Sequence, residues 1–207
     1  ERPLIAIVGG AKVSTKLQVL ESLSRKVDQL IMGGGIANTF LSASGVNIGK
    51  SLCERELVGT AKKIMDSTNV PLPSDVVIAK DCHADSVPVV KAVSEIEDDD
   101  IILDIGPETA GNFSDLIESM RTVIWNGPMG VFEFPQFSRG TESIALAVAR
   151  NEGFSIAGGG ETIAAIDRFA VGNDISYIST GGGAFLEFVQ GGQLPAVQIL
   201  KEKSNNF

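Results

Sequence analysis

Cysteine, histidine and basic residues are scarce in this chain of 207 residues. The two cysteines, Cys53 and Cys82, and the single histidine, His83, lack the spacing of zinc ligands, so we expect free thiols and no metal at His83. Lysine and arginine number 17 against 26 acidic residues, a net charge of −9 that argues against binding to nucleic acid or to an anionic membrane. No run approaches the ~18 consecutive apolar residues of a membrane span, and no signal peptide is recognisable. We therefore expect a soluble protein of the reducing cytoplasm.

Glycine, in contrast, is abundant, in a chain with the composition of a globular protein. Hydrophobic residues make up 43% of the chain and charged residues 21%. Glycine accounts for 23 of the 207 residues, which exceeds the roughly 7% of an average protein. The glycines form pairs and triplets at 9–10, 33–35, 158–160 and 181–183, and two more flank the Pro-Met pair at 128–129. Most of these groups follow a short apolar run, so we interpret them as turns between strands and helices.

Short β-branched runs alternate with segments of helical periodicity along the chain. We predict strands at 4–8, 29–32, 76–79, 101–105, 122–125, 154–157 and 176–179, and helices at 14–25, 36–43, 54–67, 108–120, 140–151, 162–169 and 184–190. The first run is apolar throughout, as in a strand covered by helices on both faces. The alternation predicts a single α/β domain, a three-layer α/β/α Rossmann-like fold with a mainly parallel, about six-stranded sheet. The irregular segment from Lys80 to Asp100 is interpreted as a surface excursion that ends in a solvated acidic turn at 97–100.

Glycine turns that follow parallel strands meet at one edge of the sheet, where α/β proteins bind their ligands. Bare backbone and the N–H groups of first helical turns suit a phosphate there. In a helix that begins near Ser14, Lys12 and Lys16 would lie on one side, in conflict with the positive end of the helix dipole. A bound polyphosphate would remove that conflict. The alternative interpretation is that both lysines are solvated at the surface and bind no ligand. The stretches 9–16 and 33–38 match neither the P-loop nor the dinucleotide-binding glycine fingerprint.

Five motifs occur in order along the chain: Gly9-Gly-Ala-Lys-Val13, Gly33-Gly-Gly-Ile-Ala37, Trp125-Asn-Gly-Pro-Met-Gly-Val-Phe-Glu133, Gly158-Gly-Gly-Glu-Thr162 and Ser179-Thr-Gly-Gly-Gly-Ala184. Together they resemble the C-terminal, nucleotide-binding half of the phosphoglycerate kinase family. The resemblance implies a glycolytic phosphotransferase that moves a phosphoryl group between 1,3-bisphosphoglycerate and ADP, with Mg²⁺ as cofactor and ATP or ADP as substrate. It further implies a monomer in which residues 1–207 are the nucleotide-binding domain, the 3-phosphoglycerate-binding N-terminal half is missing, and a tail at 193–207 would return toward that half.

The resemblance also assigns residues to the site. Those that would line the phosphates are Gly10, Ala11, Lys12 and Lys16. The adenosine slot would comprise Gly34, Gly35, Gly106 and the stretch Asn126 to Val131, Pro128 included, with Glu133 accepting hydrogen bonds from the ribose hydroxyls. The residues that would lie by the phosphates and Mg²⁺ are Gly158, Gly159, Gly160, Glu161 and Thr162, with Glu161 at the metal. The catalytic set would be Lys12, Lys16, Gly160 and Gly183, the two glycines acting through backbone N–H groups.

Two positions depart from the family pattern. Glu161 stands where aspartate is more common, so its contact with the metal is either direct or through water. Thr15 also replaces a common aspartate, which affects only a local contact.

Phosphoryl transfer needs positioning and charge neutralisation more than covalent help from the protein. The sequence shows no obvious base, which agrees with transfer to ADP, because the attacking oxygen of ADP is already ionised. Two other functions stay open, a dinucleotide-binding oxidoreductase domain and a non-catalytic nucleotide-binding module. An oxidoreductase domain would carry its glycine fingerprint at the first turn, where this chain has lysines. We expect the isolated chain to bind Mg-nucleotide with negligible turnover.

Overall fold

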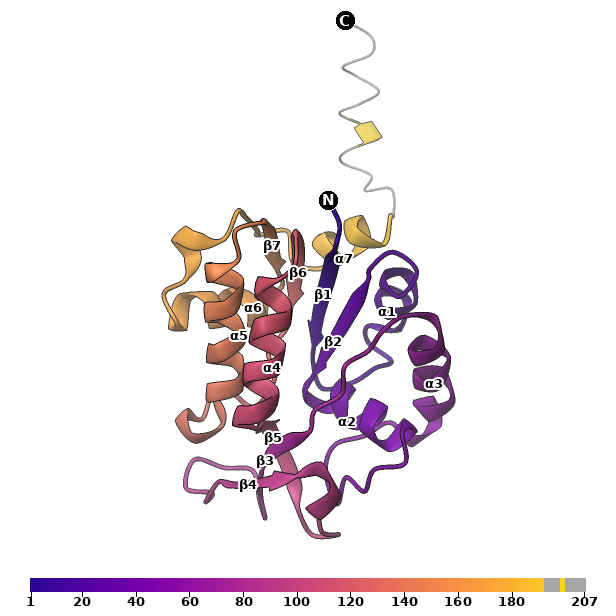
Figure 1. Ribbon diagram of the computed structural model, residues 1–207, viewed down its shortest axis with the longest axis vertical. Helices are drawn as coiled ribbons and strands as arrows, with labels where there is room; N and C mark the ends of the chain where they lie inside the picture. The colour runs from indigo at the N-terminus through magenta and orange to yellow at the C-terminus, as the bar shows by residue number, and fades with distance from the viewer. Residues whose placement is uncertain (192–197, 200–207) are drawn as a thin grey trace, which may run out of the picture.

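The computed structural model describes residues 1–191 and 198–199, and its centre is a parallel sheet of five strands. The strands lie in the order β2-β1-β6-β7-β8 (Figure 1). Their bounds are Leu4–Gly9 for β1, Gln29–Gly33 for β2, Thr122–Asn126 for β6, Phe154–Gly158 for β7 and Tyr177–Ser179 for β8. Because β2 lies on one side of β1 and β6 on the other, the strand order reverses between β1 and β6. The predicted tail at 193–207 lies outside the described residues, apart from 198 and 199.

Helices cover both faces of this sheet. Their bounds are Leu17–Leu23 for α1, Gly34–Ala43 for α2, Val58–Ser67 for α3, Pro107–Glu118 for α4, Arg139–Arg150 for α5, Gly160–Arg168 for α6 and Gly183–Gln190 for α7. The β1 residues Ile5 and Ile7 pack into one core with α4, α5 and α6, whereas Ala6 and Val8 pack into another with α1, α2 and α3. Figure 1 shows these two groups of helices on opposite sides of the sheet. The three-layer α/β/α fold predicted from the alternation of strands and helices is thereby confirmed.

Two of the predicted strands belong to a second, antiparallel sheet of order β4-β3-β5. Its strands span Asp75–Ala79 (β3), Val89–Ala92 (β4) and Ile101–Ile105 (β5). The chain touches the free edge of β2 at Asn69, whose carbonyl accepts the Leu30 N–H at 2.9 Å. Pro71 and Pro73 follow, and proline cannot continue the hydrogen-bond ladder. The chain leaves the parallel sheet there and forms β3 beyond its carboxyl edge (Figure 1). Strand β4 lies within the segment interpreted as a surface excursion, and its side chains are mostly exposed, so it lacked a buried pattern.

The first helix begins later than predicted. The N–H and the hydroxyl of Ser14 both donate to the Glu54 carboxylate, at 2.8 and 2.5 Å, so Ser14 binds a distant segment instead of capping a helix. Helix α1 starts only at Leu17. Lys12 and Lys16 therefore precede the helix, and the prediction that they share one of its faces was wrong. Lys12 is exposed, and Lys16 is half-buried.

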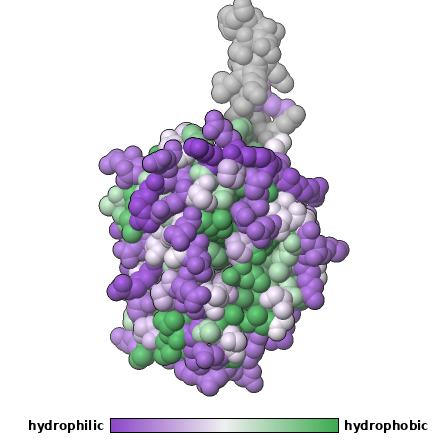
Figure 2. Space-filling view, in the orientation of Figure 1, coloured by the Kyte–Doolittle hydropathy of each residue, from purple (hydrophilic) through white to green (hydrophobic). Residues whose placement is uncertain are grey.

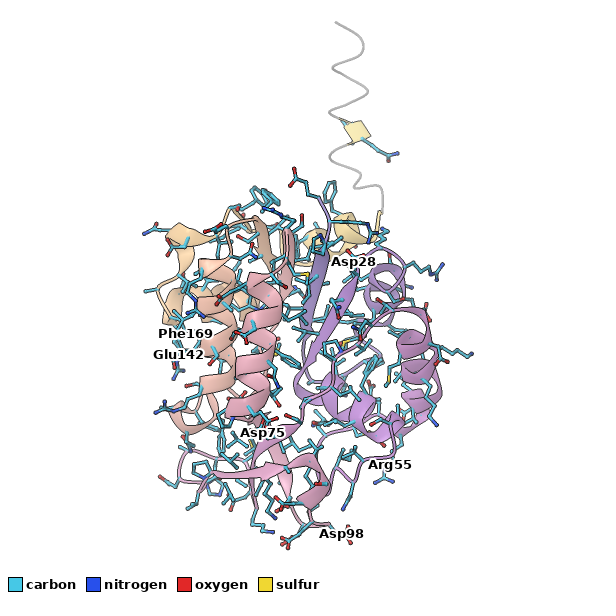
Figure 3. All side chains as sticks on the ribbon, viewed as in Figure 1. Asp28, Arg55, Asp75, Asp98, Glu142 and Phe169 are labelled. Carbon is cyan, nitrogen blue, oxygen red and sulfur yellow. The ribbon has the colours of Figure 1, made fainter. Side chains whose placement is uncertain are left out.

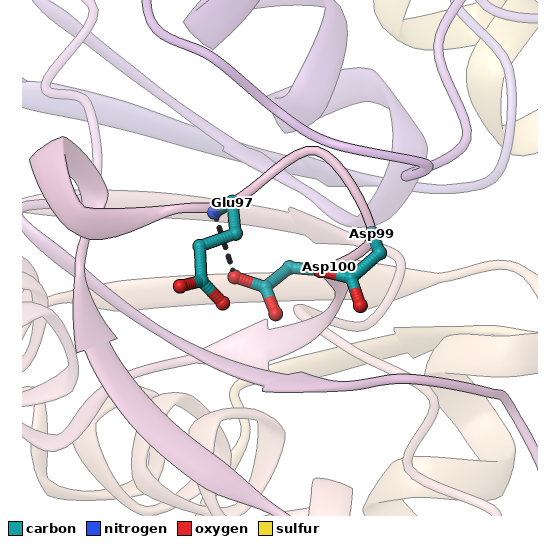
Figure 4. Close-up of side chains that lie close together, drawn as sticks. All are labelled: Glu97, Asp99 and Asp100. Atoms are coloured by element: carbon teal, nitrogen blue, oxygen red, sulfur yellow. Dashed lines mark hydrogen bonds between the residues drawn. The ribbon is translucent and has the colours of Figure 1, made fainter.

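The sequence predicts that the whole acidic turn at 97–100 is solvated, and for Asp100 this prediction was wrong. The Asp100 side chain is 0% exposed, and the ammonium groups of Lys80 and Lys91 each lie 2.8 Å from one of its oxygens. Its carboxylate also accepts the Glu97 N–H at 2.8 Å, the bond drawn in Figure 4. Burial by itself raises the pKa of Asp100, but the two lysines and this N–H outweigh it and lower the pKa to about 2. Asp100 thus anchors the turn that leads into β5.

Polar side chains cover most of the face shown in Figure 2, and apolar residues gather in its lower half. The exposed apolar residues include Val87, Val89 and Val90, at and near β4. Within the described part of the chain, no helix is both long enough and apolar enough to cross a membrane.

Candidate functional site

The glycine turns converge at the carboxyl edge of the parallel sheet. Gly9 at the end of β1 pairs with Gly33 at the end of β2, and Val8 pairs with Asn126 at the end of β6. At the other side, the end of β7 pairs with the end of β8. The strand ends are therefore level with one another, which confirms the predicted convergence. In open α/β sheets, ligands bind where the strand order reverses, which here is the gap between β1 and β6.

The glycines at the ends of β1 and β2 make room for backbone. A Cβ atom on Gly9 would lie 1.8 Å from the Pro128 carbonyl oxygen, and a Cβ atom on Gly33 would lie 2.4 Å from the same oxygen. The Gly34 N–H donates to the Met129 carbonyl at 2.8 Å. The loop after β6 therefore lies directly on the first two strand ends, and neither Gly9 nor Gly33 could carry a side chain there.

Lys16 links three of the converging turns. Its ammonium group donates to the Gly9 carbonyl at 2.5 Å, to Asn126 Oδ1 at 2.7 Å and to the Asn126 carbonyl at 3.3 Å. The Nδ2 of Asn126 donates in turn to the Gly158 carbonyl at 2.5 Å. Burial lowers the pKa of Lys16, and the nearby Glu161 carboxylate raises it in part. A half-buried cation thus stands at the ends of β1 and β6, connected through Asn126 to the end of β7.

A cavity of about 310 Å³ opens beside this ammonium group. Its walls come from the first turn of α6, the residues just before α6 and α7, the end of β6 and Lys16, and consist of Lys16, Asn126, Gly127, Gly159, Gly160, Glu161, Thr162 and Gly182. Glu161 is exposed, whereas Thr162 is buried and its hydroxyl accepts the Gly127 N–H at 2.7 Å. The first N–H groups of α6, a lysine and unobstructed glycine backbone together suit a small anion.

A larger and mainly apolar cavity of about 460 Å³ adjoins it, and Glu161 lines both. The turn after β1 and the start of α2 form one wall, and β5 with the loop after β6 forms another. The lining residues from these walls include Gly10, Ala11, Gly34, Gly35, Ile101, Ile102, Leu103, Asp104, Ile105, Pro128, Met129, Gly130 and Val131. The two cavities share Glu161 in their walls and together offer an apolar part and a cationic part.

Glu133 and Cys82 also line the larger cavity, and both are exposed. Cys82 lies on the loop of residues 81–86, which Gln136 holds by donating to one of its carbonyls at 2.7 Å. Partial desolvation of the thiol raises the pKa of Cys82, and the carboxylates of Glu133 and Asp81 raise it further. The thiol therefore stays protonated near neutral pH. Both cysteines are free, as predicted.

Most predicted site residues line one cavity or the other. Within the described part of the chain, four of the predicted residues line neither cavity: Lys12, Gly106, Gly158 and Gly183. Lys12 is exposed to solvent, and the Gly158 carbonyl is occupied by Asn126. Gly183 begins α7 directly after Gly182, which lines the smaller cavity.

Sequence reasoning missed the wall formed by β5. The predicted residue in this region was Gly106, which lines a separate groove between α4, α5 and the second sheet. Because β5 runs antiparallel in its own sheet, the residues before Gly106 line the larger cavity instead. Gly106 lies against Asp75, whose carboxyl carbon would be 2.2 Å from an added Cβ atom. The apolar run at 101–105 is the sequence feature from which this wall could have been predicted.

One carboxylate, that of Glu161, faces the smaller cavity, and this fits a magnesium ion held largely by a bound ligand. Mg²⁺ in proteins usually takes one or two carboxylates and completes its coordination with water and phosphate oxygens. The carboxylates of Glu97, Asp99 and Asp100 also lie within 4.8 Å of one another (Figure 4). Lys80 and Lys91 already form ion pairs with this group and offset two of its three negative charges, so it suits an ion less well.

These features define an α/β protein with a two-part candidate ligand site at the carboxyl edge of its parallel sheet. The model of the phosphoglycerate kinase family matches residues 1–192, and the chain belongs to that family. Among solved structures, phosphoglycerate kinase from Coxiella burnetii is similar over 98% of this chain, with a TM-score of 0.94 and 48% sequence identity. Phosphoglycerate kinase from Pyrococcus horikoshii OT3 is similar over 100% of it, with a TM-score of 0.85 and 31% identity. Each match covers 54% of the other chain, so this chain spans about half the length of these relatives.

Proposed function

We propose that this chain binds ADP and ATP as the nucleotide-binding half of an enzyme that transfers a phosphoryl group between 1,3-bisphosphoglycerate and ADP. The observation that carries the proposal is the junction, at Glu161, of an apolar cavity and a glycine-walled cavity that holds Lys16. A nucleotide has the same two-part chemistry, an apolar base followed by a charged phosphate chain. Membership of the phosphoglycerate kinase family supports this choice of nucleotide and reaction.

The larger cavity suits adenosine. Its volume of about 460 Å³ lies within the range of roughly 300–1,000 Å³ that is typical of small-molecule sites. The flat base fits between the glycine turn at 34–35 and β5, where small and apolar residues leave a slot. Glu133, exposed on this cavity, then accepts hydrogen bonds from the ribose hydroxyls.

The smaller cavity suits the phosphates. In the proposed complex the Lys16 ammonium turns from its present partners, Gly9 and Asn126, toward a phosphate oxygen. The exchange is favourable because a phosphate oxygen carries a negative charge, whereas the present acceptors, the carbonyl and amide oxygens of Gly9 and Asn126, are neutral. We assign Lys12, exposed two residues after Gly10, to the transferring phosphoryl group, together with the backbone N–H groups of Gly160 and Gly183.

Glu161 would hold Mg²⁺ together with phosphate oxygens, and the ion supplies charge neutralisation when it is bound. The remaining side chains position and neutralise the substrate and need not remove a proton, because the attacking oxygen of ADP is already ionised. In-line positioning and electrostatic stabilisation account for most of the catalysis of phosphoryl transfer. The surface for 3-phosphoglycerate lies, in this proposal, on a partner half, so the chain alone has negligible turnover.

Isothermal titration calorimetry with ADP, with and without Mg²⁺, tests the proposal, with NADH as the matched dinucleotide. We expect saturable binding of ADP and none of NADH. Saturation by NADH without ADP binding would reverse the assignment in favour of an oxidoreductase domain. A coupled assay with 1,3-bisphosphoglycerate and ADP tests the second part, and substantial turnover by this chain alone would contradict the division of the site between two halves.

A further inference from the structure

Asp104 on β5 is a buried acidic residue that the proposed reaction does not use. It is 1% exposed, and its carboxylate accepts the Ile105 N–H at 2.9 Å and the Gly140 N–H at 2.7 Å. Two glycines make room for it, because a Cβ atom on Gly130 or Gly140 would lie 2.5 or 2.3 Å from Asp104 Oδ1. Asp104 is also among the residues that line the larger cavity. A carboxylate is therefore enclosed by backbone at the rim of the candidate adenosine site.

The loop of residues 128–131, here called the cavity loop, is hydrogen-bonded to both β5 and α5. The Val131 N–H donates to the Leu103 carbonyl on β5 at 2.8 Å. The Met129 N–H donates to the Thr141 hydroxyl on α5 at 3.1 Å. The position of this loop therefore depends on how β5 and the start of α5 lie relative to each other.

Asp104 fixes that relation, because it follows Leu103 on β5 and binds the N–H of Gly140, which precedes Thr141 on α5. The hydrogen bonds form a closed ring from β5 through the cavity loop to α5 and back to β5. We propose that Asp104 is a positioning residue, whose ionised carboxyl group holds the start of α5 against β5 and so keeps the cavity loop in the shape that binds adenosine. This inference rests on the proposed nucleotide function of the cavity.

Protonation of Asp104 would open the ring. Each oxygen of the ionised group faces an N–H donor, whereas a protonated carboxyl group has an O–H of its own and accepts less well at that oxygen. Burial raises the pKa of Asp104 to about 7, although the N–H groups of Gly140 and Ile105 act in the opposite direction. The carboxyl group is therefore able to change its charge within the physiological range of pH.

Other charged groups lie on the elements packed around Asp104. They are Arg139, Glu142 and Arg150 on α5, Glu133 after the cavity loop, Asp75 on β3, and Lys50, Cys82 and Glu161 on the cavity wall. Among the described residues, none of them forms an ion pair with Asp104. Its hydrogen-bond partners among the described residues are the backbone N–H groups of Ile105 and Gly140, so the ring responds mainly to the protonation of Asp104 itself.

The dissociation constant of adenosine as a function of pH tests the proposal. Adenosine is the suitable probe because it carries no phosphate, whose own ionisation at about pH 6 would change ADP binding in the same range. If adenosine needs the ionised carboxylate, its affinity for the wild-type chain falls roughly tenfold from about pH 8 to about pH 6. Asp104→Asn, which keeps the shape but cannot ionise, should bind roughly tenfold more weakly at about pH 8 and show no such slope.

Two control variants separate this role from general effects. Asp75→Asn removes a similar buried carboxylate, one that accepts N–H groups at the start of α4 at 2.7 and 3.1 Å, where Figure 3 labels it. His83→Gln removes the only histidine of the chain. Both variants should keep the wild-type slope, whatever they do to stability.

Several results would overturn the proposal. A wild-type affinity that is flat across this pH range, or an equal slope in Asp104→Asn, contradicts it. Absence of adenosine binding at about pH 8 rejects the proposed nucleotide function itself, and is distinguishable from a binding curve that is flat with pH. Should Asp104→Asn not fold, the carboxyl ¹³C resonance of Asp104 in the wild-type chain decides: saturating adenosine should lower its titration midpoint, and an unchanged midpoint contradicts the proposal.

Discussion

Replacement of Lys16 by methionine tests the phosphate end of the proposed site. Methionine keeps most of the apolar stem and removes only the ammonium group, which in the present structure donates to Gly9 and Asn126. ADP should then lose the cation that meets its phosphates, whereas adenosine, which has no phosphate, should not. The comparison of the two ligands therefore separates the charge of Lys16 from any general disturbance of the site.

The expected loss can be estimated from the chemistry of this contact. A hydrogen bond to a charged group contributes about 1.5–3 kcal/mol, and about 1.4 kcal/mol corresponds to a tenfold change in affinity. We expect ADP to bind Lys16→Met about 10-fold to 100-fold more weakly. The stability of the unbound chain should change little, by about 1 kcal/mol or less, because the lost hydrogen bonds and the removed burial of a charge have opposite signs.

Calorimetric titration of both ligands, with urea unfolding of each variant, provides the measurement. Lys62→Ala is the matched control, since Lys62 is an exposed lysine on α3 and its loss removes the same charge. Adenosine affinity should agree within about twofold among the wild-type chain and both variants. The reasoning about the smaller cavity is refuted if Lys16→Met binds ADP as tightly as Lys62→Ala does.

Three further predictions concern packing, the ribose and the acidic turn. Gly9→Ala should lower the free energy of unfolding by at least about 1–3 kcal/mol, because its Cβ atom would lie 1.8 Å from the Pro128 carbonyl oxygen. Gly59→Ala, where an added Cβ meets nothing within 4 Å, should be neutral or stabilising, and equal effects in urea unfolding would contradict this. Glu133→Ala should weaken adenosine about tenfold in calorimetry but leave 2′,3′-dideoxyadenosine unchanged, and equal losses would detach Glu133 from the ribose. Asp100, with its pKa lowered to about 2, should add stability that is present above the ordinary value of 3.8 and is lost as pH falls toward 2. Urea unfolding at about pH 5 and about pH 3 should therefore show a larger loss for the wild-type chain than for Asp100→Asn, and parallel losses would count against the ion pairs of Asp100 with Lys80 and Lys91.

The layered fold could be predicted because its signals are local. The first strand is apolar at every position, and both of its faces are buried under helices in the structure. Short apolar runs and helical periodicity likewise located the main strands and helices. The antiparallel sheet could not be predicted in this way, because a strand's pattern of side chains does not specify its neighbour. Its separation from β2 depends on the prolines after Asn69, which prevent the chain from continuing along that edge.

Other differences arise from contacts between residues far apart in sequence. Helix α1 begins late because Ser14 binds Glu54, which lies 40 positions away. Asp100 is buried because Lys80 and Lys91 fold over it, although its sequence context is a run of acids. A run of acidic residues therefore indicates an exposed segment only if no lysine or arginine from another element pairs with it. Neither contact leaves a periodic signal in the sequence.

The glycine turns were a sound guide to the place of the candidate site, because backbone can approach closely only where side chains are absent. Gly9 and Gly33 do make that approach possible, but they make room for the loop after β6. The β5 wall and Cys82 carry no motif, and only the course of the second sheet brings them to the cavity. The roles of individual residues toward a nucleotide stay predictions.

A crystal structure of this chain grown with Mg-ADP would show whether one nucleotide occupies both cavities. We predict the base between the start of α2 at 34–35 and β5, and the phosphates in the smaller cavity beside Lys16 and Glu161. Density for ADP elsewhere, or both cavities without nucleotide at a saturating concentration, would contradict it.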